Sequence, residues 1–278
     1  SKVQAFIVRQ IVQPYKIPWF RISGQTRQFQ NVRREADQIV RDYVQLRRQR
    51  GDAELDLLQQ IIETPHRDSG DYLHDEQAVV ELLQLLVAGN ETSSNTLSWT
   101  FYLLAKHPEH LVIMREEIEA SCNAGEVTFE KLHGLNYALA VLNEAMRLYP
   151  AFWMIDRVAL QADEIGGVAV AAGTTVIPYI YGVHRNADIW KNPDQFDPTR
   201  FMGEHRRHPF AHIPFGGGPR VCIGQNMAIM QMLLVIVAIV RKYNFKLDPD
   251  REIGTRALMI LRPDSPINMK FSRIPAPI

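Results

Sequence analysis

One cysteine lies in a setting that favours its thiolate form. Cys222 belongs to the glycine-rich run Pro214–Gly224, and an apolar stretch that predicts a helix begins at Ile223. Glycines let such a loop wrap with its N–H groups pointing inward, and the positive end of a helix stabilises a nearby negative charge. Both effects stabilise a thiolate over a thiol. The loop therefore predicts a nucleophile or a soft metal ligand at Cys222.

Other kinds of site at this loop have weaker support. A nucleophilic cysteine would need a histidine base, but His205, His208 and His212 lie in a proline-interrupted stretch without a fixed register. The same proline breaks the helical face on which these histidines could bind zinc. No phosphate-binding motif of the GxGxxG or GxxxxGKS/T type occurs. Cys122, the other cysteine, is too distant in sequence to suggest a CxxC zinc site.

A second unusual segment is polar although it lies inside an apolar helical pattern. Residues 88–96 read AGNETSSNT, between the apolar runs 82–87 and 97–104. Glycine in a helix interior costs about 1 kcal/mol relative to alanine, and Ser, Thr and Asn compete for backbone hydrogen bonds. Gly89 would let a flat group approach the backbone, and Thr92 could donate its hydroxyl to that group. The simpler interpretation is a polar helix face that contacts buried water.

The elements that must position these residues are mainly helical. Apolar periodicity and proline stops predict helices at 26–50, 53–64, 75–106, 108–121, 135–149 and 223–243. The helix at 75–106 would be about 48 Å long, enough to cross a domain. Residues 168–178 predict a hairpin around Gly173, 192–219 a long ordered loop with phenylalanine anchors, and 257–261 a short strand.

Composition excludes several classes of protein. The 278 residues carry zero net charge, 46% hydrophobic residues, two cysteines, 16 Gly and 16 Pro, which argues against disordered, disulfide-rich and collagen-like chains. Residues 1–50 hold 11 basic and 3 acidic residues, and their helical spacing predicts a solvated helix face and no nucleic-acid partner. The apolar run 227–240 is shorter than the roughly 20 residues that span a bilayer, so we expect a soluble, cytoplasmic protein.

Four segments together resemble the cytochrome P450 superfamily. The pattern Phe215-x-x-Gly218-x-Arg220-x-Cys222-x-Gly224 is similar to the haem-binding loop of that family. Three other matches follow the family's order along the chain: Ala88-Gly89-x-Glu91-Thr92 on the long helix, Glu144-x-x-Arg147, and Phe196-Asp-Pro-x-Arg200-Phe201. The resemblance implies a mainly α fold with small β-sheets, and one domain over residues 1–278. It covers only the C-terminal part of the family's fold, without the N-terminal part.

The resemblance also implies a haem b cofactor and gives roles to the residues around it. Cys222 would be the metal ligand, through the thiolate ligation that favours O–O cleavage in this family. The residues that would contact the cofactor are Cys222, Arg220, Arg157, Phe215, Gly216 and Gly224, with both arginines on the propionates. Thr92 and Glu91 would deliver protons to bound dioxygen, and Gly89 would give it room.

Two further sets of residues follow from the same resemblance. Glu144, Arg147 and Arg200 would form a buried ion network with a structural role. The substrate pocket would be lined by Ala88, Phe152, Trp153, Met154 and Leu258, whose side chains favour an apolar substrate.

The implied activity is that of a haem-thiolate monooxygenase, which inserts one oxygen atom of O2 into an apolar organic molecule. Electrons would come from a ferredoxin, a flavodoxin or a flavoprotein reductase, and Arg206 and Arg207 would contribute to a positive docking face. A peroxide-driven peroxygenase and a non-catalytic, haem-binding fragment are the alternatives. A chain that truly began at Ser1 would hold haem poorly and tend to aggregate, and the absent N-terminal part leaves room for a membrane anchor.

Overall fold

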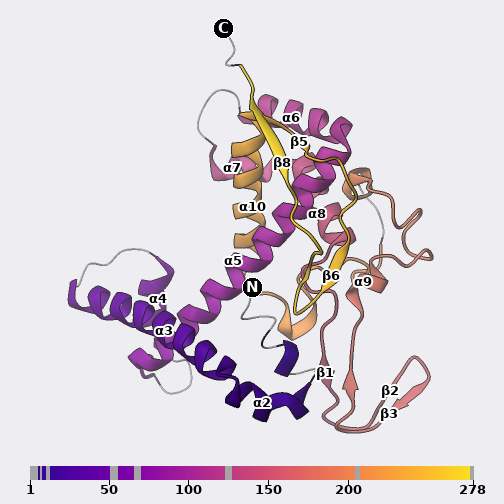
Figure 1. The fold of residues 1–278 in the computed structure, drawn as a ribbon. Coiled ribbons are helices and arrows are strands. Elements are labelled where there is room, and N and C mark those ends of the chain that lie inside the picture. The colour runs from indigo at the N-terminus through magenta and orange to yellow at the C-terminus, as the bar shows by residue number, and fades with distance from the viewer. Residues whose placement is uncertain are drawn as a thin grey trace. The chain divides into compact units, whose positions relative to one another are not determined.

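The computed structural model divides the chain into two compact units, residues 1–91 and 92–278. It describes residues 6, 8–10, 13–50, 56–65, 70–122, 127–203 and 207–275. Helix α5 (Asp75–Lys106) contributes to both units, with its bounds as predicted (Figure 1). That the 278 residues form one domain stays a prediction.

The first unit is a small helical cluster. Its elements are η1 (Pro14–Lys16), α2 (Ile17–Ile22), α3 (Gln25–Arg50), α4 (Leu57–Glu63) and the first part of α5. Val40 and Val44 of α3 are buried against apolar side chains of α4 and α5. Helix α4 begins at Leu57 because the side chain of Asp56 accepts a hydrogen bond from the backbone N–H of Gln59 at 2.8 Å. Residues 53–55 of the predicted helix lie outside the described residues.

The basic face of α3 is less solvated than its sequence predicted. Three of its arginines form ion pairs with carboxylates of the first unit that lie outside α3: Arg41 with Glu76, Arg47 with Asp56 at 2.7 Å, and Arg48 with Asp75 at 2.8 Å. These pairs are partly exposed, so solvent screening keeps the contribution of each pair to stability small. Part of the positive charge of residues 1–50 is therefore neutralised within the unit.

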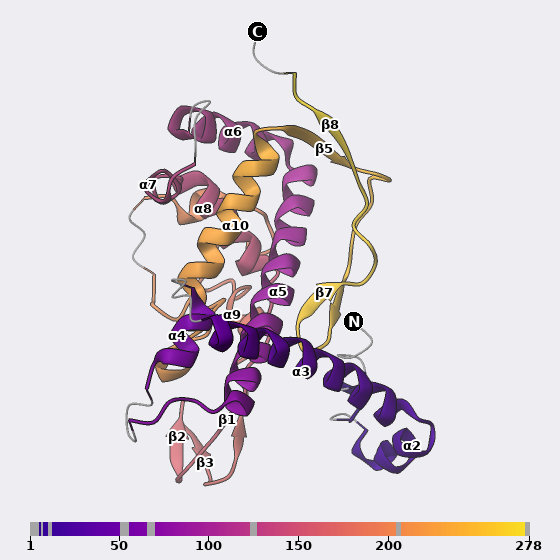
Figure 2. The same cartoon turned by 90° about the vertical axis from the view of Figure 1, so that its left-hand side faces the viewer.

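The second unit contains the main hydrophobic core. The C-terminal part of α5 packs there with α6 (Pro108–Cys122), α7 (Phe129–His133), α8 (Asn136–Leu148) and α10 (Gln225–Val240). Helix α10 runs beside α5 in both views (Figure 2). The start of α8 is fixed by Glu117, whose carboxylate accepts the N–H groups of Tyr137 at 2.7 Å and Ala138 at 2.9 Å.

The β-structure of the described residues consists of four two-stranded antiparallel ladders. They pair β1 (Arg157–Val158) with β4 (Thr175–Val176), β2 (Asp163–Ile165) with β3 (Val168–Val170), β5 (Tyr243–Leu247) with β8 (Met269–Arg273), and β6 (Thr255–Ala257) with β7 (Leu261–Pro263). Three short helices complete the unit: α9 (Ile180–Val183), η2 (Pro198–Phe201) and η3 (Gly218–Arg220).

Two predictions about strands were wrong. The predicted hairpin around Gly173 does not form, because β3 pairs with β2 and β4 pairs with β1. The tight turn lies instead at Gly166 and Gly167, whose φ angles of 59° and 80° suit a two-residue hairpin turn. The predicted strand at 257–261 contains a turn, with β6 ending at Ala257 and β7 beginning at Leu261.

The loop from 192 to 219 is ordered by some of its predicted anchors. Phe196 is buried, and Phe201 and Phe215 are half-buried, whereas Phe210 is 55% exposed. The predicted class, mainly α with small sheets, is confirmed. None of the helices in the described ranges is both long enough and apolar enough to cross a membrane.

Candidate functional site

The loop that carries Cys222 is closed by its own backbone. The N–H of Cys222 donates to the carbonyl of Phe215 at 3.0 Å, and Phe215 packs against the core of the second unit. Gly216 and Gly218 have φ angles of 77° and 71°, a region that side chains other than glycine rarely enter. A Cβ at Gly217 would lie 3.0 Å from the ring of Phe210. The glycines are thus required by the path of the loop.

The surroundings of the thiol are exposed and apolar. Cys222 is exposed, and so are its neighbours Val221, Ile223 (95%) and Met227. Helix α10 begins at Gln225, two residues later than predicted, with Gly224 as its N-cap. A soft ligand surrounded by exposed apolar side chains fits a flat, apolar cofactor whose metal accepts a thiolate. These residues therefore fit a haem.

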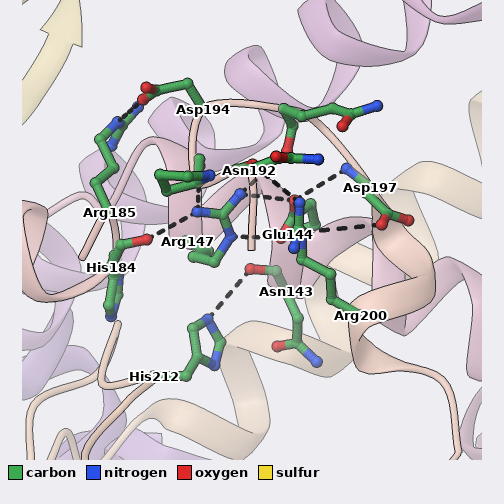
Figure 3. A network of polar contacts seen from close by, with 12 residues as sticks. Asn143, Glu144, Arg147, His184, Arg185, Asn192, Asp194, Asp197, Arg200 and His212 are labelled. Carbon is green, nitrogen blue, oxygen red and sulfur yellow. Dashed lines mark hydrogen bonds and ion pairs between the residues drawn. The ribbon is translucent and has the colours of Figure 1, made fainter. Parts of the chain in front are cut away.

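The structure brings Glu144, Arg147 and Arg200 together (Figure 3). The side chains of Glu144 and Arg147 are fully buried, and Arg147 makes a two-pronged contact with the carboxylate: Nε to Oε2 at 2.7 Å and Nη2 to Oε1 at 2.8 Å. Nε of Arg200 lies 3.3 Å from Oε1, and the backbone N–H of Asp197 donates to the same oxygen at 2.9 Å. The buried carboxylate is thereby well supplied with donors.

Arg147 also organises the segment that precedes the cysteine loop. Nη1 donates to the carbonyls of His184 at 2.8 Å and Pro193 at 2.6 Å, and Nη2 donates to that of Gln195 at 3.2 Å (Figure 3). Its guanidinium also lies 5.1 Å from the ring centre of Trp190. One guanidinium therefore fixes the path of residues 184–195.

Two histidines connect this network to the start of the cysteine loop. The backbone N–H of Ile213 donates to Nε2 of His184 at 2.9 Å, and Nε2 of His212 donates to the carbonyl of Asn143 at 3.2 Å. Burial lowers the pKa of His184 to about 4 and that of His212 to about 3, so both rings are neutral near pH 7. Only a neutral His184 can accept the hydrogen bond from Ile213.

These bonds were not predicted from the sequence. The sequence indicated His212 only as a candidate base or zinc ligand and indicated no role for His184. The sequence could have indicated these roles only through the presence of two histidines in the region of the predicted ion network and the predicted cofactor loop. Spacing alone does not reveal their bonds, because the partners are backbone groups distant in sequence.

The polar segment of α5 is continuous helix, without the break that its composition would permit. Ala88 and Gly89 are exposed, Glu91 and Thr92 are half-buried, and a Cβ at Gly89 would meet nothing within 4 Å. The hydroxyl of Thr96 donates to the carbonyl of Thr92 at 3.0 Å, so the Thr96 side chain is bonded within the helix. The exposure of Ala88 and Gly89 shows that the helix surface at Gly89 is open.

The predicted pocket residues of the second unit fall into two groups. Phe152 and Met154 are about 40% exposed. Trp153 is half-buried, and its Nε1 donates to the carbonyl of Leu258 at 2.9 Å, so these two residues are in contact.

The predicted cationic residues differ in exposure. Arg157 on β1 and Arg220 on η3 are both exposed. Arg207 lies 4.9 Å from the ring centres of both Trp190 and Phe201, and burial lowers its pKa, so it is less available for a docking face than predicted. Arg206 lies outside the described residues.

Comparison with known proteins gives one consistent family. The family model of cytochrome P450 matches residues 1–271. Cytochrome P450 734A5 of Oryza sativa subsp. japonica is 42% identical over 193 residues, covering 67% of this chain and 36% of the relative. Cyclooctat-9-en-7-ol 5-monooxygenase of Streptomyces melanosporofaciens is 32% identical over 222 residues, covering 79% and 48%.

A solved structure supports the same fold. The crystal structure of the cytochrome P450DA heme domain superposes with a TM-score of 0.80 at 28% identity, covering 87% of this chain and 56% of that one. The predicted family and fold are confirmed. The chain spans about half the length of the curated relatives it matches.

Proposed function

The chain belongs to the cytochrome P450 family, and on that premise we propose that the protein is a haem-thiolate monooxygenase acting on an apolar organic substrate. The observation that carries the proposal is the exposed thiol of Cys222 in a glycine-shaped loop, surrounded by exposed apolar side chains. When bound, haem would supply activation of dioxygen, with electrons from a redox partner.

The chain's own residues hold the cofactor in this proposal. Sγ of Cys222 would ligate the iron, and Val221, Ile223 and Met227 would offer apolar side chains to the macrocycle. The exposed guanidiniums of Arg220 and Arg157 would bind the propionates, while Phe215, Gly216 and Gly224 shape the loop. The positive end of the 16-residue helix α10, three residues after Cys222, stabilises the thiolate charge.

The helix α5 supplies the groups that handle protons. Thr92 carries a hydroxyl and Glu91 a carboxylate at consecutive positions, and in this proposal Oγ1 of Thr92 would hold a proton for delivery to dioxygen. Gly89, without a side chain, leaves space beside the helix. The support for these roles is the match of residues 88–92 to the family's motif together with the open surface at Gly89.

The substrate is expected to be apolar. Phe152 and Met154 expose hydrophobic surface, and Leu258 adds an aliphatic side chain. The name of the Streptomyces relative, a monooxygenase of cyclooctat-9-en-7-ol, is consistent with oxygen insertion into an organic molecule. A ferredoxin, flavodoxin or flavoprotein reductase would deliver the electrons.

The carbon monoxide difference spectrum of the dithionite-reduced holoprotein tests this proposal. We expect the strongly red-shifted Soret band that a thiolate ligand of the haem iron would produce, and we expect Cys222→Ser to abolish it. Cys122→Ser is the matched control, because Cys122 is buried in the core at the end of α6. A red-shifted band that survives Cys222→Ser would refute the assignment.

Turnover distinguishes the remaining alternatives. The proposal predicts product formation with O2 and a reductase, whereas activity supported only by hydrogen peroxide would identify a peroxygenase. Haem binding without either activity would favour the non-catalytic alternative.

A further inference from the structure

Three segments of the second unit are joined by an unusual set of hydrogen bonds. Asn95 of α5 is 8% exposed, and its Nδ2 donates to the carbonyl of Leu261 at 2.9 Å. The N–H of Leu261 donates to the carbonyl of Ala151 at 2.8 Å. Leu261 thus connects the central helix to the segment that follows α8. Asn95 lies three residues after Thr92 and therefore on a neighbouring part of the helix surface.

Trp153 makes the second connection. Its Nε1 donates to the carbonyl of Leu258, and its own carbonyl accepts the N–H of Tyr181 at 3.0 Å. The indole also packs edge-on against the ring of Tyr179, with centroids 6.3 Å apart. Its indole is therefore held by one hydrogen bond and one aromatic contact, and its backbone by a second hydrogen bond.

The two bonds hold both ends of one turn. Residues 258–260 join β6 to β7. The carbonyl of Leu258, the first residue of this turn, accepts from Trp153, and the carbonyl of Leu261, the residue after it, accepts from Asn95. Within the turn, Ile260 is buried and Met259 is 45% exposed. A ladder of three residue pairs is weak on its own, so side-chain donors from two other segments contribute substantially to the turn's position.

We propose that Asn95 and Trp153 are positioning residues that fix the 258–260 turn and thereby set the substrate selectivity of the site. This inference rests on the proposed function, in which this turn and residues 152–154 contact the substrate. Because the indole N–H is already bonded to Leu258, Trp153 offers no donor to a ligand. The side chains left exposed are Phe152, Met154 and Met259, none of which donates a strong hydrogen bond. Selectivity would then depend on the shape set by the turn.

Variants of each donor test the proposal in the holoprotein. Asn95→Leu removes the donor at similar volume, and benzothienylalanine at position 153 keeps the ring shape but has sulfur in place of the N–H. Ser98→Ala is the matched control, because the exposed Ser98 lies one turn from Asn95 and its hydroxyl donates only to the carbonyl of Ser94. Two measurements are made: amide hydrogen exchange in 255–263, and dissociation constants for imidazole and 4-phenylimidazole.

The expected effects follow from the loss of one hydrogen bond. Either change should speed exchange in 255–263 by about fivefold to tenfold, equivalent to about 1 to 1.4 kcal/mol. The affinity for 4-phenylimidazole, whose ring reaches beyond the iron, should change by about fivefold relative to imidazole. Imidazole affinity and the carbon monoxide spectrum should stay at the parent's values.

Distinct outcomes overturn the two proposals. Exchange and relative affinity unchanged in both variants, or altered equally by Ser98→Ala, would overturn the positioning role. If the parent protein showed no haem spectral response to imidazole, the proposed function would fail, and the exchange measurement would still decide whether the two donors hold the turn.

Discussion

Replacing Arg147 by methionine removes the guanidinium that joins α8 to residues 184–195. Arg147 donates five hydrogen bonds, two to Glu144 and three to backbone carbonyls. In Arg147→Met the carboxylate of Glu144 stays fully buried and keeps only the N–H of Asp197 and the Nε of Arg200 as donors. Removing one partner of a buried pair costs about 3–5 kcal/mol, which is a large part of a typical stability.

Two comparison variants separate charge from general disruption. Arg200→Met removes a partly exposed arginine that makes one bond to Glu144 and one to the carbonyl of Asn192, so about 1–2 kcal/mol is expected. The double variant Glu144→Met/Arg147→Met leaves no buried carboxylate without its partner, and Arg200 keeps the carboxylate of Asp197 at 4.0 Å. It should therefore be more stable than Arg147→Met, although three backbone carbonyls, those of His184, Pro193 and Gln195, still lack their donor.

Urea unfolding of the holoprotein measures these differences as shifts of the midpoint at constant slope. The expected order of stability is parent, Arg200→Met, the double variant and then Arg147→Met. The reasoning would be refuted if Arg147→Met lost less than about 1 kcal/mol, or if the double variant were less stable than Arg147→Met.

Two further predictions concern His184 and Thr92. Burial lowers the pKa of His184 to about 4 from the ordinary 6.5, so the unfolded chain binds the proton first. The neutral ring of His184 therefore contributes fully to the free energy of unfolding above about pH 6.5. As the pH falls towards 4 the free energy of unfolding decreases by about 3 kcal/mol. His184→Gln should reduce the pH dependence of the urea midpoint over this range and leave the part that is due to His212. A pH dependence equal to the parent's would contradict this prediction. Thr92→Ala should retain haem but divert electrons to hydrogen peroxide, with Thr92→Ser as control; undiminished coupling of electrons to product would contradict the role of Thr92.

The sequence predicted local features better than long-range ones. Helix α5 was predicted with correct bounds because the polar residues before Asp75 and the pair His107-Pro108 mark its ends. The strand pairing was wrong because periodicity shows that a segment is extended but does not show which strand it pairs with. The two short strands that flank Gly173 fit the hairpin pattern as well as the strands that flank Gly166 and Gly167. In the structure the hairpin turn lies at Gly166 and Gly167, where β2 pairs with β3.

The candidate site shows the same division. The network of Glu144, Arg147 and Arg200 was predicted from the family resemblance. Glu144 and Arg147 lie one helical turn apart, which is compatible with their contact, but no spacing relates Arg200 to them. The bond between His184 and Ile213 joins residues distant in sequence through a backbone group, which leaves no side-chain pattern. The same holds for Trp153, which the family resemblance placed in the pocket lining and whose indole N–H donates to the carbonyl of Leu258.

The acceptors of Arg147 in residues 184–195 are all main-chain carbonyls, and this affects how the segment tolerates mutation. A carbonyl is present whatever the side chain, so exchanges at exposed positions such as Asp188 and Lys191 leave the anchor intact. Inserting or deleting one residue would instead shift every carbonyl out of register with a guanidinium held rigidly by Glu144. The segment between α9 and η2 is therefore permissive in composition at its exposed positions and strict in length.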